Sequence, residues 1–331
     1  TNSTRKIDAT NNWWRHSGTD VNLSSQIISP TLPYRPAICD RAPVPSFNVA
    51  DGDVGGLIAA IRYANLQTTL ITINLAPNGT YILTTPAEIL MADSLGLPLI
   101  SGDLVIEGNG ATITRSTAEG TPNFRILSSD GADLSLNNLT ISNGAGPNGA
   151  GIYVSDTDLS LNQVTLLNNR SLVTNSLGGG IYSSGQDNEI SIRNSRLEGN
   201  SAVANGGAIW INSYLYLYDS LFLNNSANNG GAIYVHDYET FSSSNSCFVN
   251  NGITSVFVGE YSSSVNLTNS WWNSTNGPSG EGNGNGDSVS VRVTYEPFLT
   301  TPPAHCLDVV PLQATSQSLM VLPYLPTFDI T

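Results

Sequence analysis

Lysine is almost absent from this chain of 331 residues, in which Lys6 is the single example. Charged residues make up 11% of the sequence, and the formal net charge is −14. An acidic surface with so few cations is unsuited to the phosphates of nucleic acids and to anionic membranes. We therefore expect no nucleic-acid partner.

Long apolar runs are missing as well. No run reaches roughly 18 residues, the length that a membrane-spanning helix needs, so we expect no membrane span. The sequence contains no nucleotide-binding, zinc-binding or nucleophile motif, and we expect no cofactor; calcium at Asp51 and Asp53 or at Asp287 remains an alternative.

Cysteine is scarce, with Cys39, Cys247 and Cys306 in the whole chain. An odd number leaves at least one cysteine unpaired or shared with another chain. We consider a disulfide of Cys39 with Cys306 or with Cys247, within or between chains.

Glycine, in contrast, is abundant, with 31 residues. It marks four nearly identical motifs, each a pair of small residues followed by isoleucine and an aromatic residue. The isoleucines are 29, 28 and 24 positions apart, at Ile152, Ile181, Ile209 and Ile233. A period of roughly 20–50 residues is typical of repeat architectures, and these strand-like units predict a β-solenoid.

A second repeated segment lies between the glycine motifs. It alternates apolar and polar residues as a half-buried strand does. Its copies start at Leu134, Leu159, Ile190, Leu215, Phe241 and Val265, with a looser copy at Leu104. Stacked coil on coil, these residues form one inward column. A second column comprises Ile141, Leu166, Leu197, Phe222, Phe248 and Trp272.

A polar turn separates the two columns. It is occupied by Asn138, Gln163, Asn194, Asp219, Asn245 and Asn269. Stacked amides can bond one another along the axis, and the Asn pairs near the coil ends suit turns with positive φ. The pattern predicts an all-β fold, a single-stranded parallel β-helix of about eight coils.

A short helix is expected before the first full coil. Residues 54–65 carry apolar side chains at helical spacing, and Asp53 is a suitable N-cap. Such a helix would cover the open end of the solenoid. We divide the chain into a segment 1–39, a linker and capping helix 40–69, the β-helix 70–306 and a tail 307–331.

The start of the chain resembles its own closing segment. Residues 7–14 match 265–272, including Trp13-Trp14 with Trp271-Trp272, and residues 20–39 run parallel to 287–306. Three interpretations remain open. The chain is cut from a tandem protein, or the segment folds back on its own solenoid, or it docks on another subunit. Head-to-tail docking of this kind produces filaments.

An outward apolar stripe is the second indication of assembly. If the second column faces inward, its neighbours Leu221, Leu223, Cys247, Val249 and Trp271 face outward on the last coils. Exposed stripes usually mark an interface. We therefore assign a subunit interface to these residues with Trp13, Trp14 and Trp272. The alternative is that closing loops at 273–301 fold over the stripe.

Several motifs resemble secreted or surface right-handed parallel β-helix proteins of bacteria. The similar segments are residues 49–61, 72–81, 109–113, 136–141 and 271–280. The family is related to the CSLREA-type and polymorphic outer-membrane-type repeat proteins, although the CSLREA hexapeptide is absent. The resemblance implies the right-handed form of the β-helix, export and a cell-surface or matrix role, and it transfers no catalytic residues.

Parallel β-helices also include polysaccharide lyases and glycosidases. The best catalytic set available is His236 and Asp237 with Arg193 and Arg196 on neighbouring coils, although we favour the interpretation that His236 and Asp237 are solvated loop residues. Outward Tyr214, Tyr216 and Tyr218 could stack on sugars, or be ordinary strand residues.

We interpret the chain as a non-enzymatic extracellular structural protein, a subunit of a surface filament, sheath or adhesive assembly. Self-association and contact with cell-surface polysaccharide are the expected interactions. A carbohydrate-active or carbohydrate-binding β-helix is the alternative.

Overall fold

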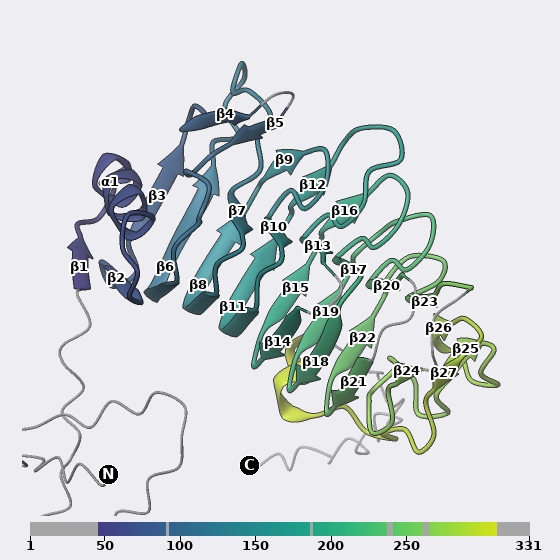
Figure 1. Ribbon diagram of the computed structural model, residues 1–331. Helices are drawn as coiled ribbons and strands as arrows, with labels where there is room; N and C mark the ends of the chain where they lie inside the picture. Colours follow the sequence, from purple (N-terminus) through teal and green to yellow (C-terminus); the bar gives the residue numbers. More distant parts are fainter. Residues whose placement is uncertain (1–45, 91–92, 186–187, 237–240, 261–264, 310–331) are drawn as a thin grey trace, which may run out of the picture. The chain divides into compact units, whose positions relative to one another are not determined.

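A computed structural model describes residues 46–90, 93–185, 188–236, 241–260 and 265–309 (Figure 1). Through these ranges the chain winds into stacked coils whose strands pair in parallel with the coils before and after. The antiparallel pair described is β4 (Glu88–Leu90) with β5 (Asp93–Leu95), a hairpin outside the stack. None of the described helices is both long and apolar enough to cross a membrane.

The largest sheet contributes one or two strands from each coil. Its main path is β1 (Ser46–Val49), β2 (Ile71–Leu75), β6 (Leu104–Arg115), β8 (Leu134–Ser142), β11 (Leu159–Leu167), β14 (Glu189–Arg193), β18 (Tyr214–Tyr218), β21 (Phe241–Ser244), β24 (Val265–Asn266) and β27 (Val293–Thr294). Off this path lie β3 (Thr80–Leu83), β15 (Arg196–Glu198), β19 (Leu221–Leu223) and β22 (Cys247–Val249).

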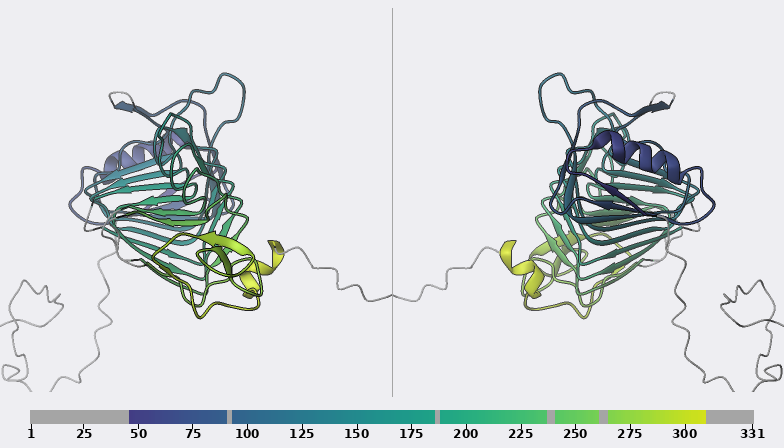
Figure 2. Two further views of the ribbon diagram at one scale, coloured as in Figure 1. Left: turned by 90° about the vertical axis from the view of Figure 1, so that its right-hand side faces the viewer. Right: turned by 90° about the vertical axis from the view of Figure 1, so that its left-hand side faces the viewer.

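Two smaller sheets complete the coils. The first consists of β7 (Leu127–Asp130), β10 (Ile152–Ser155), β13 (Ile181–Ser184), β17 (Ile209–Ile211), β20 (Ile233–Val235), β23 (Val256–Val258), β26 (Gly286–Val289) and β25 (Pro278–Gly280). The second consists of β9 (Ala145–Gly146), β12 (Arg170–Ser171) and β16 (Ser201–Ala202). Viewed along the stack, the coils lie one behind another around a common interior (Figure 2).

The predicted inward columns form the core. Leu134 pairs in register with Leu159, and the same register continues through Ile190, Leu215 and Phe241. All members of both columns are buried. Parallel in-register pairing places like side chains over one another, so one apolar position per coil builds a continuous core. The parallel β-solenoid is confirmed, and its right hand stays a prediction.

The polar turn between the columns has the predicted conformation. Each of its six residues has a positive φ, from 46° at Asn138 to 56° at Gln163 and Asn269. Side chains with short polar groups tolerate this left-handed region, because they bond the local backbone. The amide of Asn194 donates to Asn162 Oδ1 on the preceding coil, so amide bonding along the axis occurs here.

Helix α1 (Val54–Ala64) covers one end of the stack, as expected. The Asp53 carboxylate accepts a hydrogen bond of 2.8 Å from Gly56 N, which makes it the N-cap. The apolar face with Leu57 and Ile61 is buried on the first coils. The solenoid begins earlier than expected, because β1, within the predicted linker, already pairs with β2.

Candidate functional site

Outward-facing residues of the last coils form an apolar cluster separate from the main core. Leu221, Leu223, Cys247, Val249 and Trp271 are each at most 5% exposed. They do face away from the core, as expected. However, Leu299 and Cys306 of the chain's own closing segment pack against them, so the stripe is not exposed as expected. The cover includes a residue of the expected closing loops, Leu299, and one beyond them, Cys306, and the role of the stripe in a subunit interface stays a prediction.

The cover is the segment that follows β27. Leu299 and Cys306 pack against the cluster, and Cys306 lies in a 3₁₀ helix, η2 (Ala304–Val309). Cys306 forms a disulfide with Cys247, 59 residues earlier, with Cα atoms 6.5 Å apart. Both proposed partners of Cys39 are thus bonded to each other, which differs from the expected pairing. We call this disulfide with η2 the clasp.

Trp272 also differs from its expected role at an interface. Its side chain is fully buried in the main core. Its ring stacks on Phe248 at 4.6 Å, and Phe248 stacks on Phe222 at 5.2 Å. Trp272 therefore ends the second inward column, as the alternation of the sequence predicts.

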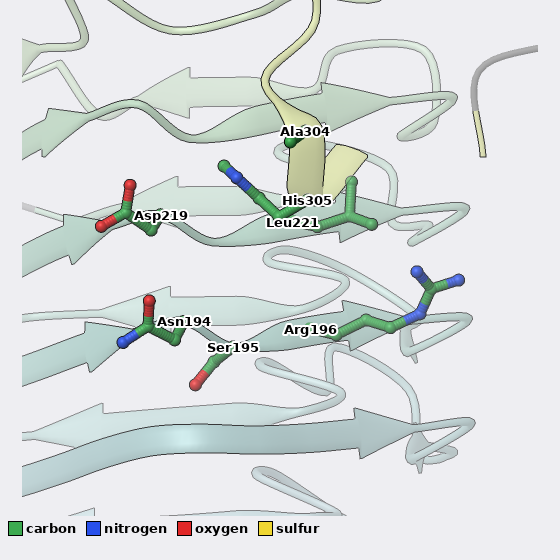
Figure 3. Close-up of a pocket in the computed structure, with 7 residues that line it drawn as sticks. All are labelled: Asn194, Ser195, Arg196, Asp219, Leu221, Ala304 and His305. Carbon is green, nitrogen blue, oxygen red and sulfur yellow. The ribbon is translucent and has the colours of Figure 1, made fainter. Parts of the chain in front are cut away.

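A shallow pocket of about 400 Å³ lies beside the clasp (Figure 3). Its lining consists of Asn194, Ser195, Arg196, Asp219, Leu221, Ala304 and His305. Asn194 and Asp219 come from the polar turns of successive coils, and His305 reaches over β19 from η2. The pocket brings a carboxylate, a guanidinium and an imidazole to one surface.

Most polar groups of this pocket already have protein partners. Arg196 pairs with Glu198 at 2.7 Å, and Asp219 accepts from the Asn245 amide. Ser195 Oγ donates to the Arg193 carbonyl and accepts from a backbone N–H. Ser195 is thus held by backbone groups, so the lining favours binding over nucleophilic chemistry. His305 is exposed, and its Nε2 is 3.9 Å from Cys247 Sγ.

Of the catalytic alternative, the described residues His236, Arg193 and Arg196 do not share one cleft. His236 follows β20 and packs on the Trp210 ring at 4.9 Å. β20 belongs to the 8-stranded sheet, whereas Arg193 and Arg196 lie in the 14-stranded sheet. The Arg193 guanidinium covers the Tyr218 ring at 4.0 Å. Paired catalytic groups must share one cleft, and these residues are on different sheets.

The outward tyrosines of β18 do not form an aromatic column. Tyr216 pairs with Ser191 on one side and Ser242 on the other. Tyr214 is the most exposed of the three, and Arg193 covers the face of Tyr218.

An aromatic column does exist on the 8-stranded sheet, and we did not predict it. It consists of Tyr153, Tyr182, Trp210, Tyr234 and Phe257, which occupy equivalent positions of successive strands. The signal was the aromatic residue after each isoleucine of the glycine motifs. Three neighbouring pairs stack face to face: Tyr153 on Tyr182 at 5.2 Å, Tyr182 on Trp210 at 4.6 Å and Tyr234 on Phe257 at 5.3 Å. These stacked faces are not available to a sugar.

A buried cation closes one end of this column. The Arg125 guanidinium lies 4.4 Å over Tyr153 and pairs with Asp93 at 2.7 Å. Burial lowers the pKa of Arg125, and the Asp93 charge partly compensates. Pairing with Asp93 is the arrangement that lets a buried guanidinium remain charged.

A second ladder, of asparagines, runs inside the coils. Asn169, Asn200, Asn225 and Asn251 are buried, and each amide donates to the next Oδ1 along the series at 2.9–3.0 Å. We expected both residues of each Asn pair to serve a turn. The first residues, Asn168, Asn224 and Asn250, do so with positive φ, whereas the second residues form the ladder. The signal in the sequence was one asparagine per coil of the ladder, at a constant spacing along the chain after the residue of the second inward column in that coil.

Asp287 ends this ladder. Its Oδ1 accepts from the N–H and the amide of Asn251, and its Oδ2 accepts from Asn250 N. Burial raises the pKa of Asp287, and the hydrogen bonds oppose the increase. The calcium alternative for this residue has no support in this geometry, because both oxygens are engaged.

An acidic column precedes the main strands. Asp103, Asp133 and Asp158 directly precede β6, β8 and β11, and Glu189, the first residue of β14, occupies the equivalent position. Asp103 Oδ1 accepts from Asp133 N, and Asp158 Oδ1 from Glu189 N. Burial and then the charges of Asp158 and Asp103 raise the pKa of Asp133.

Four residues of our expected sites, Trp13, Trp14, Cys39 and Asp237, lie outside the described residues.

Comparison with known families gives one short match. Residues 219–236 match the Chlamydia polymorphic membrane protein repeat. These residues run from the polar turn of one coil, through β19 and a glycine motif, to the end of β20. No curated protein matches the chain. The match agrees with the resemblance to polymorphic outer-membrane-type repeats, and it covers part of one coil.

Proposed function

We propose that the protein is a structural or adhesive β-solenoid of a cell surface and that it is not an enzyme. One observation carries the proposal. The repeated asparagines of the ladder hydrogen-bond to one another along the stack, and aromatic rings of the column stack on one another. These repeated residues do not converge on a cavity. The match to a membrane-protein repeat at residues 219–236 supports a surface location.

An adhesion assay tests this proposal against the enzymatic alternative. Beads coated with the full chain are applied to cell layers and to films of acidic and neutral polysaccharides, with heat-unfolded protein as control. We expect retained beads and no new reducing ends or unsaturated products. Release of products that is lost in His236→Ala or Arg193→Ala would contradict the proposal.

Cell-surface polysaccharide is the ligand class that we propose for adhesion. Tyr214 and Tyr216 of β18 offer outward aromatic side chains with serines on the coils beside Tyr216. Substitution of both tyrosines by alanine should weaken retention on polysaccharide films. The matched control is Ile253→Ala, which removes an exposed apolar side chain elsewhere; equal loss in both variants would contradict this assignment.

Head-to-tail assembly through residues 1–39 is the finer part of the proposal. Its support is the similarity of this segment to residues 265–306. Because a neighbour's apolar cluster is covered by its own clasp, docking requires another surface or displacement of that clasp. Sedimentation velocity and negative-stain microscopy should show polymers of the full chain and monomers after deletion of 1–39. Particles of unchanged size after the deletion would contradict it.

A further inference from the structure

We propose that the clasp is also a metal site. When Cys247 and Cys306 are thiols, they bind Zn²⁺ together with His305. The disulfide and the metal are then two alternative ways to close the same segment over the apolar cluster.

The positions of the three side chains suit one ion. Cys247 Sγ, Cys306 Sγ and His305 Nε2 all lie within 4.8 Å of one another. In a tetrahedral zinc site with Zn–S of about 2.3 Å and Zn–N of about 2.0 Å, sulfur and nitrogen are roughly 3.5 Å apart. The Cys247 Sγ to His305 Nε2 distance is 3.9 Å.

The two sulfurs need a modest rearrangement. In the same tetrahedral geometry they are roughly 3.8 Å apart, so they must separate from their bonded distance. The two Cα atoms are already 6.5 Å apart. Rotation of the cysteine side chains therefore suffices, and η2 need not leave the coil.

The donor set selects the kind of metal. Two thiolates and an imidazole are ligands for zinc, whereas calcium and magnesium require oxygen. Both cysteines are fully buried, and the two thiolate charges neutralise Zn²⁺, so the ion adds no net charge to the apolar cluster. His305 is exposed at the pocket, which leaves the fourth position to water.

The two closures exclude each other, because the sulfurs of a disulfide are bonded to one another. In the unfolded chain, where the sulfurs are accessible, a dithiol reductant supplies two electrons and two protons to the sulfurs and itself becomes a disulfide. Zn²⁺ binding then releases the two thiol protons to solvent. Because both sulfurs are buried, an external thiol has no access in the closed clasp. The metal form therefore arises when the chain folds while Cys247 and Cys306 are still thiols, before they are oxidised to the disulfide.

Cobalt binding tests the proposal. The full chain with Cys39→Ser, which leaves two cysteines, is unfolded and refolded with a phosphine reductant, and Co²⁺ is added. We expect one Co²⁺ per chain, with thiolate-to-cobalt charge-transfer and tetrahedral d–d bands, and displacement by Zn²⁺. His305→Ala should weaken Co²⁺ binding about tenfold or more. Ca²⁺ should change nothing.

Three results would overturn the proposal. They are no charge-transfer band in the reduced protein, the same band in the oxidised protein, or unchanged binding in Cys247→Ser. Near-UV circular dichroism shows whether each sample has a packed tryptophan core. If the reduced chain refolds in the presence of Zn²⁺ but not in its absence, the metal closure is supported, because the ion then supplies the folding free energy.

Discussion

At the residue scale, Asp287 supplies the two acceptors that Asn250 and Asn251 need at the end of the asparagine ladder. In the preceding coils, each ladder asparagine donates its amide to the asparagine of the next coil, as Asn225 does to Asn251. The backbone N–H of the residue before it donates to a backbone carbonyl, as Asn224 N does to Val249 O. Asp287 Oδ1 takes the first role and Oδ2 the second. An ionised carboxylate accepts at both oxygens, which an amide cannot do.

We therefore predict that Asp287→Asn destabilises the protein. Its NH₂ would face a backbone N–H, which costs about 1–3 kcal/mol in the free energy of unfolding. Asp287→Ala should cost more, since all three hydrogen bonds are lost. Urea denaturation at neutral pH measures both, and an Asn variant as stable as the parent would refute the role.

The acidic column makes a prediction about pH. Because the pKa of Asp133 is raised above 3.8, the folded state binds more protons than the unfolded state between 3.8 and that pKa. The free energy of unfolding therefore rises as pH falls through this window, and the cost of burying the carboxylate and of its repulsion by Asp158 and Asp103 is complete above it.

Asp133→Asn should accordingly stabilise the protein at pH 7 by a few tenths of a kcal/mol, since adjacent like charges are removed while the acceptor oxygen remains. The gain should vanish near pH 3 and shrink in high salt. Thermal unfolding at several pH values is the measurement, with the exposed Glu119→Gln as control. An equal gain in the control would show a general charge effect.

At the scale of elements, ladders along the axis join each coil to the next. The side chain of Asn225 alone takes part in four hydrogen bonds: it donates to Leu197 O and Asn251 Oδ1, and it accepts from the N–H and amide of Asn200. These bonds span three coils in the dry interior. Such buried polar networks are stabilising when every member is satisfied.

Asn225→Ala should therefore lower the free energy of unfolding by about 3–4 kcal/mol, because it leaves buried donors and a carbonyl without partners. The matched control is its exposed neighbour Asn224, whose φ is 54°. Asn224→Gly keeps that conformation accessible and should cost a few tenths of a kcal/mol. Similar losses in both variants would contradict the ladder's role.

At the scale of the described solenoid, each coil contacts its two neighbours, so stability is a sum of local terms. Helix α1 covers one end of the stack, whereas the clasp lies over the outward face of β19 and β22 in the last coils. Opening of one end therefore leaves the distant coils intact.

We predict that removal of the disulfide acts locally. In Cys306→Ser, hydrogen exchange should accelerate in β19, β22 and residues 265–306 and remain unchanged in β2 and β6. Mass spectrometry of exchanged peptides resolves this difference. Uniform acceleration along the chain would show that the solenoid unfolds as one unit.

The repeat pattern was sufficient for the fold because it depends on alternation alone. Leu134 and Ile141, with their counterparts, had to face one interior, and Asn138 had to occupy a turn. The capping helix followed from Asp53 and the spacing of Leu57 and Ile61. These are local properties, which the period of the chain repeats coil after coil.

The sequence by itself therefore determined the solenoid, its columns and its capped end, since each depends on residues close in the chain. Only the tertiary structure decided what covers the outward stripe and which cysteines pair, because Cys306 reaches Cys247 from 59 residues away. It also decided that Arg193 and His236 lie on different sheets. Which residues of a coil face each other depends on where the loops return the chain, and side-chain alternation carries no information about that path.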